Sequence, residues 1–254
     1  MKVVILAGGL GTRLSEYTDM IPKPMVTIGN HPLLWHLMQS FASHGYNEFV
    51  IAAGYKSQII KQYFLNYRSL NSDLTIDLST GEVLEQSDSH SDWKVTVVDT
   101  GENTMTGGRL KRLSKYIDNE RFILTYGDGI SNVKINQLVQ FNIDSQRLAT
   151  VTAVHPVARF GELTLNDETV TSFAEKPQTS SGWINGGFFV MEPECLNYIE
   201  NDQTVLEKYP LSKLAEEGNL GAFRHDGFWQ CMDTRRDRDS LEESWISGNA
   251  PWKT

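Results

Sequence analysis

The chain has 254 residues, 40% of them hydrophobic and 22% charged, with a net charge of −9. This length suits one large α/β domain, and the negative charge argues against non-specific nucleic-acid binding because the protein's own field repels polyanions. Two cysteines are too few for a disulfide framework. The apolar run at the start stops at Gly8, too short for a signal peptide or a membrane span, so we expect a cytoplasmic protein without membrane association.

The first half of the chain alternates strand patterns with helix patterns. Val3–Ala7 is a continuous apolar run that ends in glycines, typical of a central parallel strand. Further strands are predicted at 48–53, 94–99 and 122–126, and helices at 32–44, 57–66 and 108–117. The polar stretch 71–92 interrupts this rhythm, and we interpret it as an antiparallel excursion of undefined shape.

The second half continues the same pattern. A helix is predicted at 134–144, a strand at 149–155, a hairpin of 163–165 with 170–173, a strand at 186–191, and helices near 193–199 and 235–247. No repeat or linker separates the halves. We therefore expect one domain over 1–254, with a Rossmann-like, mostly parallel mixed sheet flanked by helices and a small antiparallel extension.

Glycines follow the first strand in the loop Leu6, Ala7, Gly8, Gly9, Leu10, Gly11, Thr12, Arg13. Backbone N–H groups in such a loop can form a nest for phosphate oxygens. The dinucleotide fingerprint would need a glycine at Leu14, and the P-loop would need Lys-Ser/Thr where Thr12-Arg13 stand. A plain turn is the alternative, but a turn does not require Arg13, whose guanidinium offers a fork to the β and γ phosphates.

Three further features bear on the same chemistry. In Pro22-Lys23-Pro24 two prolines restrict the backbone around a lysine, although a surface lysine is the alternative. Asp128 ends a predicted inner strand between glycines, where it suits Mg²⁺ or forms an ordinary turn. Asp233 is either a second carboxylate for that ion or the N-terminal cap of the following helix.

LAGGLGTRL followed by PKPMVTIG resembles the signature of the sugar-1-phosphate nucleotidyltransferases, whose lysine in PKP neutralises nucleotide phosphates. Later segments, among them AAGYK, VDTGENTMTGGRLKRL, YGDGIS, INGGFFV and GFWQCMDT, are similar to cytidylyl-transferring members of that family. The likeness covers nearly the whole chain. It implies a Mg²⁺-dependent enzyme that joins CTP and glucose 1-phosphate, a homo-oligomeric state, and a division into a nucleotide half (1–130) and a sugar half (131–254).

The resemblance also implies roles for individual residues. Arg13, Lys23 and Asp128 are the expected catalytic residues, and Asp128 and Asp233 the expected metal ligands. The nucleotide is expected to contact the loop Leu6–Arg13, Lys23, Thr104, Gly108 and Arg109. The sugar phosphate is expected to contact Glu175, Lys176, Asn185 and Gly186.

Several alternatives stay open at this point. Arg109 could be a solvated helix terminus, Glu175-Lys176 a surface ion pair, and Trp229 part of the core or a wall of the sugar site. The function could involve UTP, dTTP or GTP in place of CTP, or binding without turnover. An NAD-dependent oxidoreductase shares the α/β pattern, but the missing third glycine argues against it.

Overall fold

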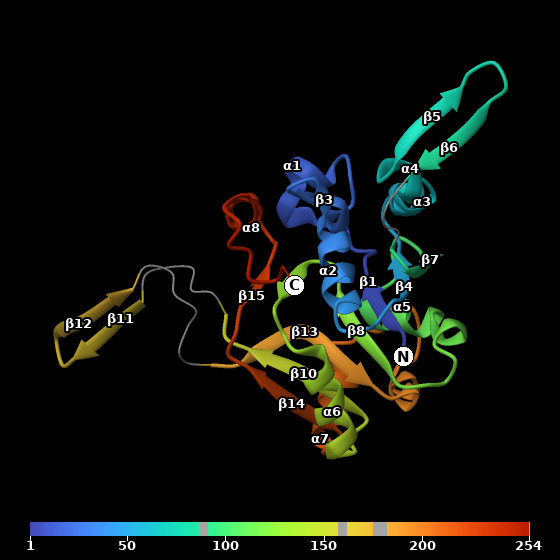
Figure 1. Cartoon of the computed structure of the whole chain (residues 1–254). Coiled ribbons are helices and arrows are strands. Elements are labelled where there is room, and N and C mark those ends of the chain that lie inside the picture. Colours follow the sequence, from blue (N-terminus) through green and yellow to red (C-terminus); the bar gives the residue numbers. More distant parts are fainter. Residues whose placement is uncertain (87–90, 157–161, 175–181, 254) are drawn as a thin grey trace.

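The computed structural model describes residues 1–86, 91–156, 162–174 and 182–253. Its centre is a seven-stranded sheet in the order β14-β10-β13-β8-β1-β4-β7 (Figure 1). These strands are β1 (Val3–Leu6), β4 (Glu48–Ala53), β7 (Lys94–Asp99), β8 (Phe122–Tyr126), β10 (Ala149–Val154), β13 (Ile184–Met191) and β14 (Leu220–His225). The mixed, mostly parallel sheet confirms the expected fold class.

The sheet is parallel except at one strand. β1 pairs in parallel with β4 and β8, β4 with β7, and β10 with β14. β13 is antiparallel to both of its neighbours, β8 and β10. This reversed strand joins the two halves of the chain into one sheet.

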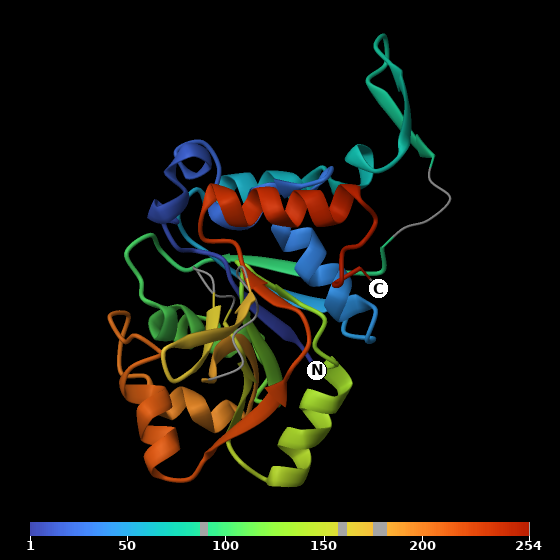
Figure 2. The same cartoon turned by 90° about the vertical axis from the view of Figure 1, so that its left-hand side faces the viewer.

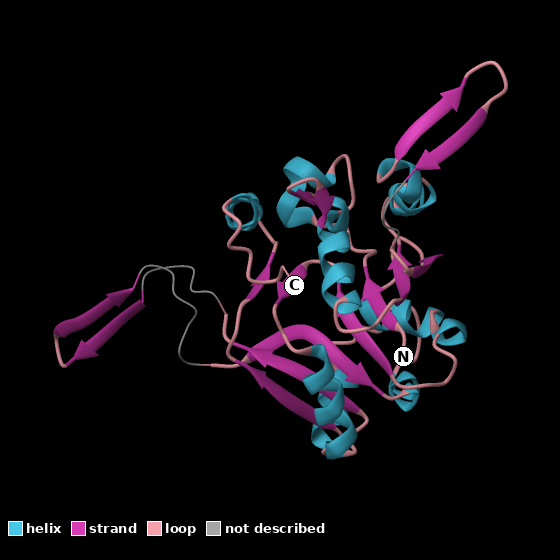
Figure 3. Cartoon of the chain, in the orientation of Figure 1, coloured by secondary structure: helices cyan, strands magenta, loops and turns pink. Residues whose placement is uncertain are grey.

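Helices cover both faces of the sheet (Figure 3). The α-helices are α1 (Ser15–Thr18), α2 (Leu33–Ala42), α3 (Ser57–Leu65), α4 (Tyr67–Leu70), α5 (Thr106–Arg112), α6 (Ile135–Ser145), α7 (Tyr209–Glu216) and α8 (Arg235–Ile246). The 3-10 helices span Thr12–Leu14, Lys23–Met25, Ser114–Tyr116 and Pro193–Tyr198. One core contains side chains of α2, α3 and α6, and the other contains side chains of α5 and α7.

Strand β1 shows why the layers form. Its four residues are all buried. Val3 and Ile5 belong to the first core, whereas Val4 and Leu6 belong to the second. Successive side chains of a strand point to opposite faces, so an uninterrupted apolar run requires a hydrophobic layer on each side.

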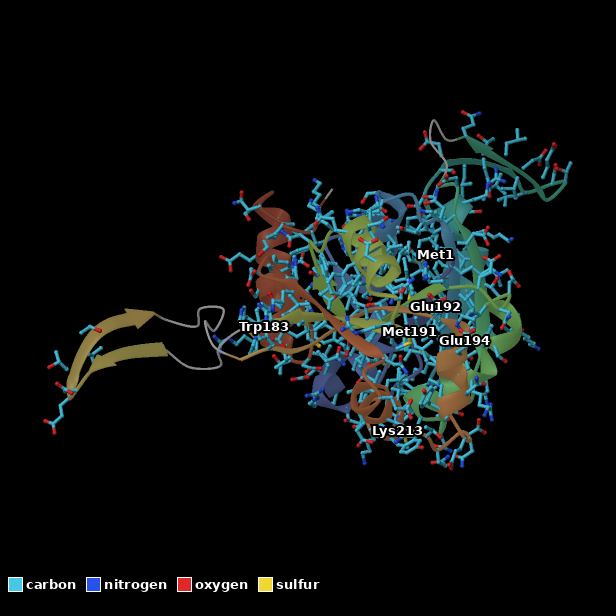
Figure 4. All side chains as sticks on the ribbon, turned by 90° about the horizontal axis from the view of Figure 1, so that it is seen from below. Met1, Trp183, Met191, Glu192, Glu194 and Lys213 are labelled. Atoms are coloured by element: carbon cyan, nitrogen blue, oxygen red, sulfur yellow. The ribbon has the colours of Figure 1, made fainter. Side chains whose placement is uncertain are left out.

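Four two-stranded sheets surround this body. They are β2 (Thr27–Ile28) with β3 (His31–Pro32), β5 (Asp73–Asp77) with β6 (Glu82–Gln86), β9 (Gly129–Ser131) with β15 (Trp229–Cys231), and β11 (Glu162–Asn166) with β12 (Thr169–Ala174). The polar excursion therefore contains the β5–β6 hairpin, which projects from the body in Figure 2. Figure 4 shows the same hairpin, with its side chains as sticks, standing out from the body.

Several sequence predictions need correction. The helix expected at 108–117 is α5, which begins at Thr106 and ends at Arg112 before a 3-10 turn. Its first turn packs closely on a neighbouring loop, because a side chain at Gly107 would collide with the backbone of Thr204 and one at Gly108 with the backbone of Asp202. The helix expected near 193–199 is a 3-10 helix over Pro193–Tyr198. α7 and β14 were not predicted.

No helix within the described residues has the combined length and apolarity that crossing a bilayer would demand.

A third, smaller core joins the C-terminus to the start of α2. It contains Leu33, Leu241 and Trp252 among its buried residues. His36 is 2% exposed beside it, with Nε2 2.9 Å from the Ile28 carbonyl oxygen and Nδ1 3.4 Å from Trp252 Nε1. The Trp252 N–H can only donate, so Nδ1 is the acceptor and the ring is neutral. Burial, with a smaller contribution from His31, lowers the pKa of His36 to about 4.

We expect His36 to destabilise the fold in acid. The unfolded histidine binds a proton below pH 6.5 and the folded one only near pH 4, so acidification between these values favours unfolding. The contribution reaches about 1.4 kcal/mol per pH unit. Denaturant unfolding at several pH values should give a shallower pH dependence for His36→Gln than for the wild type, whereas the partly exposed control His44→Gln keeps the wild-type dependence. Identical slopes for His36→Gln and the wild type would contradict this assignment.

Candidate active site

The loop from Leu6 to Arg13 lies at the carboxyl end of β1. Three backbone hydrogen bonds fix its beginning: Ala7 N donates to Ala52 O (3.0 Å), Gly127 N to Leu6 O (2.9 Å) and Tyr55 N to Gly8 O (3.2 Å). The N–H groups of the next three loop residues, 9–11, donate to no acceptor among the described residues. These free donors make the loop suitable for an anion.

Lys23 lies at the centre of the site. Pro22 is extended at φ −68° and ψ 148°, and a 3-10 turn begins at Lys23. The Lys23 ammonium lies 2.8 Å from Asp128 Oδ2 and 2.6 Å from Asp233 Oδ1, and the residue is 8% exposed. Lys23 is therefore not a surface lysine in a rigid loop.

A short strand pairing brings the two carboxylates together. Asp128 lies between β8 and β9, and Asp233 follows β15. β9 pairs with β15 so that Gly129 faces Cys231, and Met232 N donates to Asp128 O at 2.8 Å. The pairing places both aspartates beside Lys23, although they are far apart in the sequence.

Asp233 is not the cap of α8. Thr234 is the N-cap, and it forms a capping box with Asp237, whose carboxylate also accepts from Asp233 N at 3.0 Å. The box satisfies the first N–H groups of the helix and leaves the Asp233 carboxylate for other partners. Arg13 Nη2 lies 3.0 Å from Asp233 Oδ1, so two cations face the two carboxylates.

Charge pairing overcomes burial at this cluster. Burial alone would lower the pKa of Lys23, but the Asp128 charge and hydrogen bonds to both carboxylates raise it. Burial likewise opposes ionisation of Asp233, but the hydrogen bond and charge of Lys23 lower its pKa. Burial and the Asp128 charge raise the pKa of the neighbouring Cys231 thiol. The cluster is therefore a charged ion network with a protonated thiol beside it.

The two carboxylates fit a hard divalent cation. Asp128, Cys231 and Asp233 each offer one ligand atom, and these atoms lie within 4.8 Å of one another. Mg²⁺ takes few protein oxygens and completes its shell with phosphate oxygens and water, whereas a thiol suits softer metals. Lys23 now supplies the positive charge between the carboxylates, so a bound cation and the lysine would compete for the same oxygens.

A pocket of about 350 Å³ opens beside these groups. Of the predicted nucleotide and catalytic residues, the following line it: Leu6, Ala7, Gly8, Gly9, Gly11, Thr12, Arg13, Lys23, Thr104, Arg109 and Asp128. Leu10 and Gly108 are not among its lining residues. Leu10 is 48% exposed, and Gly108 packs against the backbone of Asp202.

Arg109 forms the floor of the pocket. It is 4% exposed, so it is not a solvated helix terminus. Its guanidinium donates to Thr100 Oγ1 (2.8 Å), Gly101 O (2.7 Å) and Glu102 O (3.0 Å). A side chain at Gly8 would collide with this guanidinium. The glycine thus lets the loop lie directly against a buried guanidinium whose hydrogen bonds hold it in place.

The residues predicted to contact the sugar phosphate are only partly described. Glu175 and Lys176 lie outside the described residues. Asn185 is exposed near the start of β13, and its Oδ1 accepts from Gly187 N at 2.8 Å. Gly186 O accepts from Trp229 Nε1 at 2.7 Å. The Trp229 ring packs against the first core, and its indole N–H is bonded to β13. These contacts favour a role for Trp229 in the core over one as a wall of the sugar site.

Sequence reasoning missed some residues of the site. Tyr126, Met105 and Thr106 line the pocket, and Cys231 lies beside the carboxylates. Tyr126 directly precedes Gly127 and the predicted catalytic residue Asp128, so its position in the sequence could have identified it as a site residue. Nothing local in the sequence marks Cys231, because β9 and β15 pair across a long sequence separation.

Comparison with known proteins gives a family match over most of the chain. The family model described as "Nucleotidyl transferase" matches residues 2–232. The chain is 49% identical to "Glucose-1-phosphate cytidylyltransferase" of Salmonella typhimurium, over 100% of this chain and 99% of that protein. It is 43% identical to the "Probable glucose-1-phosphate cytidylyltransferase" of Bacillus subtilis, with the same coverage. The crystal structure of HddC from Yersinia pseudotuberculosis complexed with GMP-PN is 26% identical, with a TM-score of 0.71 over 96% of this chain and 99% of that chain.

The neighbouring glycines of the loop provide a matched pair of variants. An alanine methyl at position 8 would collide with Arg109, whereas one at position 9 has open space around it. We expect Gly8→Ala to lower the unfolding free energy by about 1–3 kcal/mol, as overpacking does in well-packed sites. Gly9→Ala should leave it within about 0.5 kcal/mol of the wild type. Denaturant unfolding measures both, and equal stabilities would show that Arg109 does not contact the loop.

Proposed function

Because the chain belongs to the nucleotidyl transferase family, we propose that it transfers a cytidylyl group from CTP to α-D-glucose 1-phosphate, giving CDP-glucose and pyrophosphate. The full-length similarity to proteins named as glucose-1-phosphate cytidylyltransferases supports the choice of substrates. The observation that carries the proposal is one pocket lined by the glycine loop, Lys23 and Asp128.

The reaction requires positioning and charge compensation. A phosphate oxygen of glucose 1-phosphate attacks the α-phosphorus of CTP, and the bond to the β-phosphate oxygen breaks on the opposite side. Both reactants are polyanions, so they must be held in line while negative charge grows on the leaving group. In this proposal the N–H groups of the loop, Arg13 and Lys23, which line the pocket, would bind the triphosphate and stabilise departing pyrophosphate.

No covalent intermediate is needed. The attacking phosphate is already an anion, so a general base would add little. Cys231 is the thiol beside the carboxylates, and burial and the Asp128 charge hold it in the protonated, weakly nucleophilic form. The proposed reaction is therefore a single displacement.

Magnesium is the proposed metal. Asp128 and Asp233 would hold it, and it would neutralise charge on the phosphates. This assignment rests on the donor chemistry of two carboxylate oxygens beside the pocket. Lys23 bonds to both carboxylates and so keeps them close together before substrates bind.

The remaining assignments follow the same proposal. Thr104 and Arg109, which line the pocket, would contact the nucleotide. Glu175, Lys176, Asn185 and Gly186 would contact the sugar phosphate. The chain would act as one domain, with residues 1–130 on the nucleotide side and 131–254 on the sugar side. A homo-oligomer in the cytoplasm is also proposed, on the family resemblance and the composition.

Two substitutions test the charge cluster. Lys23→Ala and Asp128→Ala should each lower kcat by about 10² to 10³, the usual loss for one preorganised transition-state contact. Both variants should remain folded by circular dichroism. Lys94→Ala is the matched control. This exposed lysine is the first residue of β7, so it lies at the amino end of the parallel strands, away from the site at their carboxyl ends. Near-normal turnover in either site variant would remove that residue from the mechanism.

A panel of triphosphates tests the choice of base. With glucose 1-phosphate and Mg²⁺, pyrophosphate release should be fastest with CTP among CTP, UTP, dTTP and GTP. Preference for another triphosphate would retain the reaction class and reject cytidylyl transfer. Absence of turnover with all four would favour a protein that binds nucleotides without chemistry.

A further inference from the structure

A carboxylate outside the predicted site joins its two sides. Glu207 lies in the loop before α7, and its Oε1 accepts a hydrogen bond from the Tyr126 hydroxyl at 2.5 Å. Its Oε2 accepts one from Thr106 Oγ1 at 2.6 Å. Tyr126 ends β8 and Thr106 begins α5, so one side chain connects three elements. Both donors line the pocket, whereas Glu207 does not.

On the sugar side the connection continues through Tyr126. Its ring packs edge to face on Phe189 and lies where a side chain at Gly187 would collide with it, which restricts its rotation. Its hydroxyl donates to Glu207, and the neighbouring Gly187 N donates to Asn185 Oδ1 at 2.8 Å. Glu207 therefore fixes the direction of the hydroxyl proton at the point where the Tyr126 ring lies against β13.

On the nucleotide side the same loop holds the first turn of α5. Leu206 N donates to Thr106 Oγ1 at 2.9 Å, and Met105 N donates to Asp202 O at 2.8 Å. Thr106 therefore both accepts from this loop and donates to its carboxylate. Thr104, Met105 and Thr106 form one side of the pocket, so the position of this wall depends on the loop that carries Glu207.

We propose that Glu207 is a positioning residue that couples the nucleotide wall at Thr106 to the sugar side at Tyr126, whose ring lies against Gly187. It orders both substrate surfaces without touching either substrate. Its carboxylate is suited to this task because it accepts two hydrogen bonds at once, one on each oxygen. This inference rests on the proposed function, since it assigns the two sides of the pocket to the two substrates.

Steady-state kinetics of Glu207→Ala, with both substrates varied in turn, tests the proposal. We expect kcat/KM for each substrate to fall about tenfold, the effect of losing a hydrogen bond to a charged group. Glu207→Gln should recover part of the loss, because its amide oxygen accepts one of the two bonds. Glu200→Ala is the control, since this exposed carboxylate in the same segment has no hydrogen-bond partner among the described residues. It should behave as the wild type.

A double-mutant cycle with Tyr126→Phe separates coupling from a general loss of stability. If the hydroxyl acts through Glu207, the double variant should lose little more activity than either single variant. Independent, multiplicative losses would overturn the proposal, as would a Glu207→Ala enzyme with wild-type kinetic constants and only a lower Tm. Should Glu207→Ala fail to fold, Thr106→Val and Tyr126→Phe form the equivalent cycle with the same two outcomes. If the wild type were inactive with every triphosphate, the proposed function itself would be refuted. If the wild type were active and the Glu207 variants matched it, only the role of Glu207 would be refuted.

Discussion

The Lys23 ammonium between Asp128 and Asp233 is the interaction on which the rest of the site depends. A buried charge is costly unless it is paired and hydrogen-bonded, and removing one partner leaves the other uncompensated. Here the two carboxylates pair with the buried ammonium of Lys23. In return, the positive charge of Lys23 lets the two carboxylates lie close together despite their mutual repulsion. The network is completed at its exposed end by Arg13. Its charges balance before any ligand binds. In the proposed function, a polyphosphate with a divalent cation would exchange partners with it without leaving a buried charge unpaired.

The surrounding fold can be understood as the support for that network. The parallel strands β1 and β8 end side by side. The glycine loop follows the carboxyl end of β1, and Asp128 follows the carboxyl end of β8. The pairing of β9 with β15 brings Asp233 to the same place beside Asp128. The capping box of α8 fixes the backbone directly after Asp233. Arg109, below the loop, holds the carbonyl groups of the neighbouring connection and so makes a firm base for the pocket.

Strands and site residues could be predicted where a single short segment of sequence contains the pattern that identifies them. β4, β7 and β8 have the predicted bounds because each is a compact apolar or β-branched run between polar or glycine-rich segments. The glycine loop and Lys23 were found for the same reason. Features that depend on distant contacts were not predictable: the pairing that positions Asp233, the packing of Gly108 on Asp202, and the bridge of Glu207. The exposed, polar surroundings of β14 also hid its pairing with β10.

In the mechanism proposed above, this charge network promotes one direct displacement at phosphorus, with no protein nucleophile taking part. The most direct measurement is the stereochemical course at the α-phosphorus with a chiral α-thio analogue of CTP and glucose 1-phosphate. One in-line displacement predicts inversion of configuration in the CDP-glucose analogue. Retention would require two displacements and a covalent nucleotidyl-enzyme, and it would rule out the single displacement.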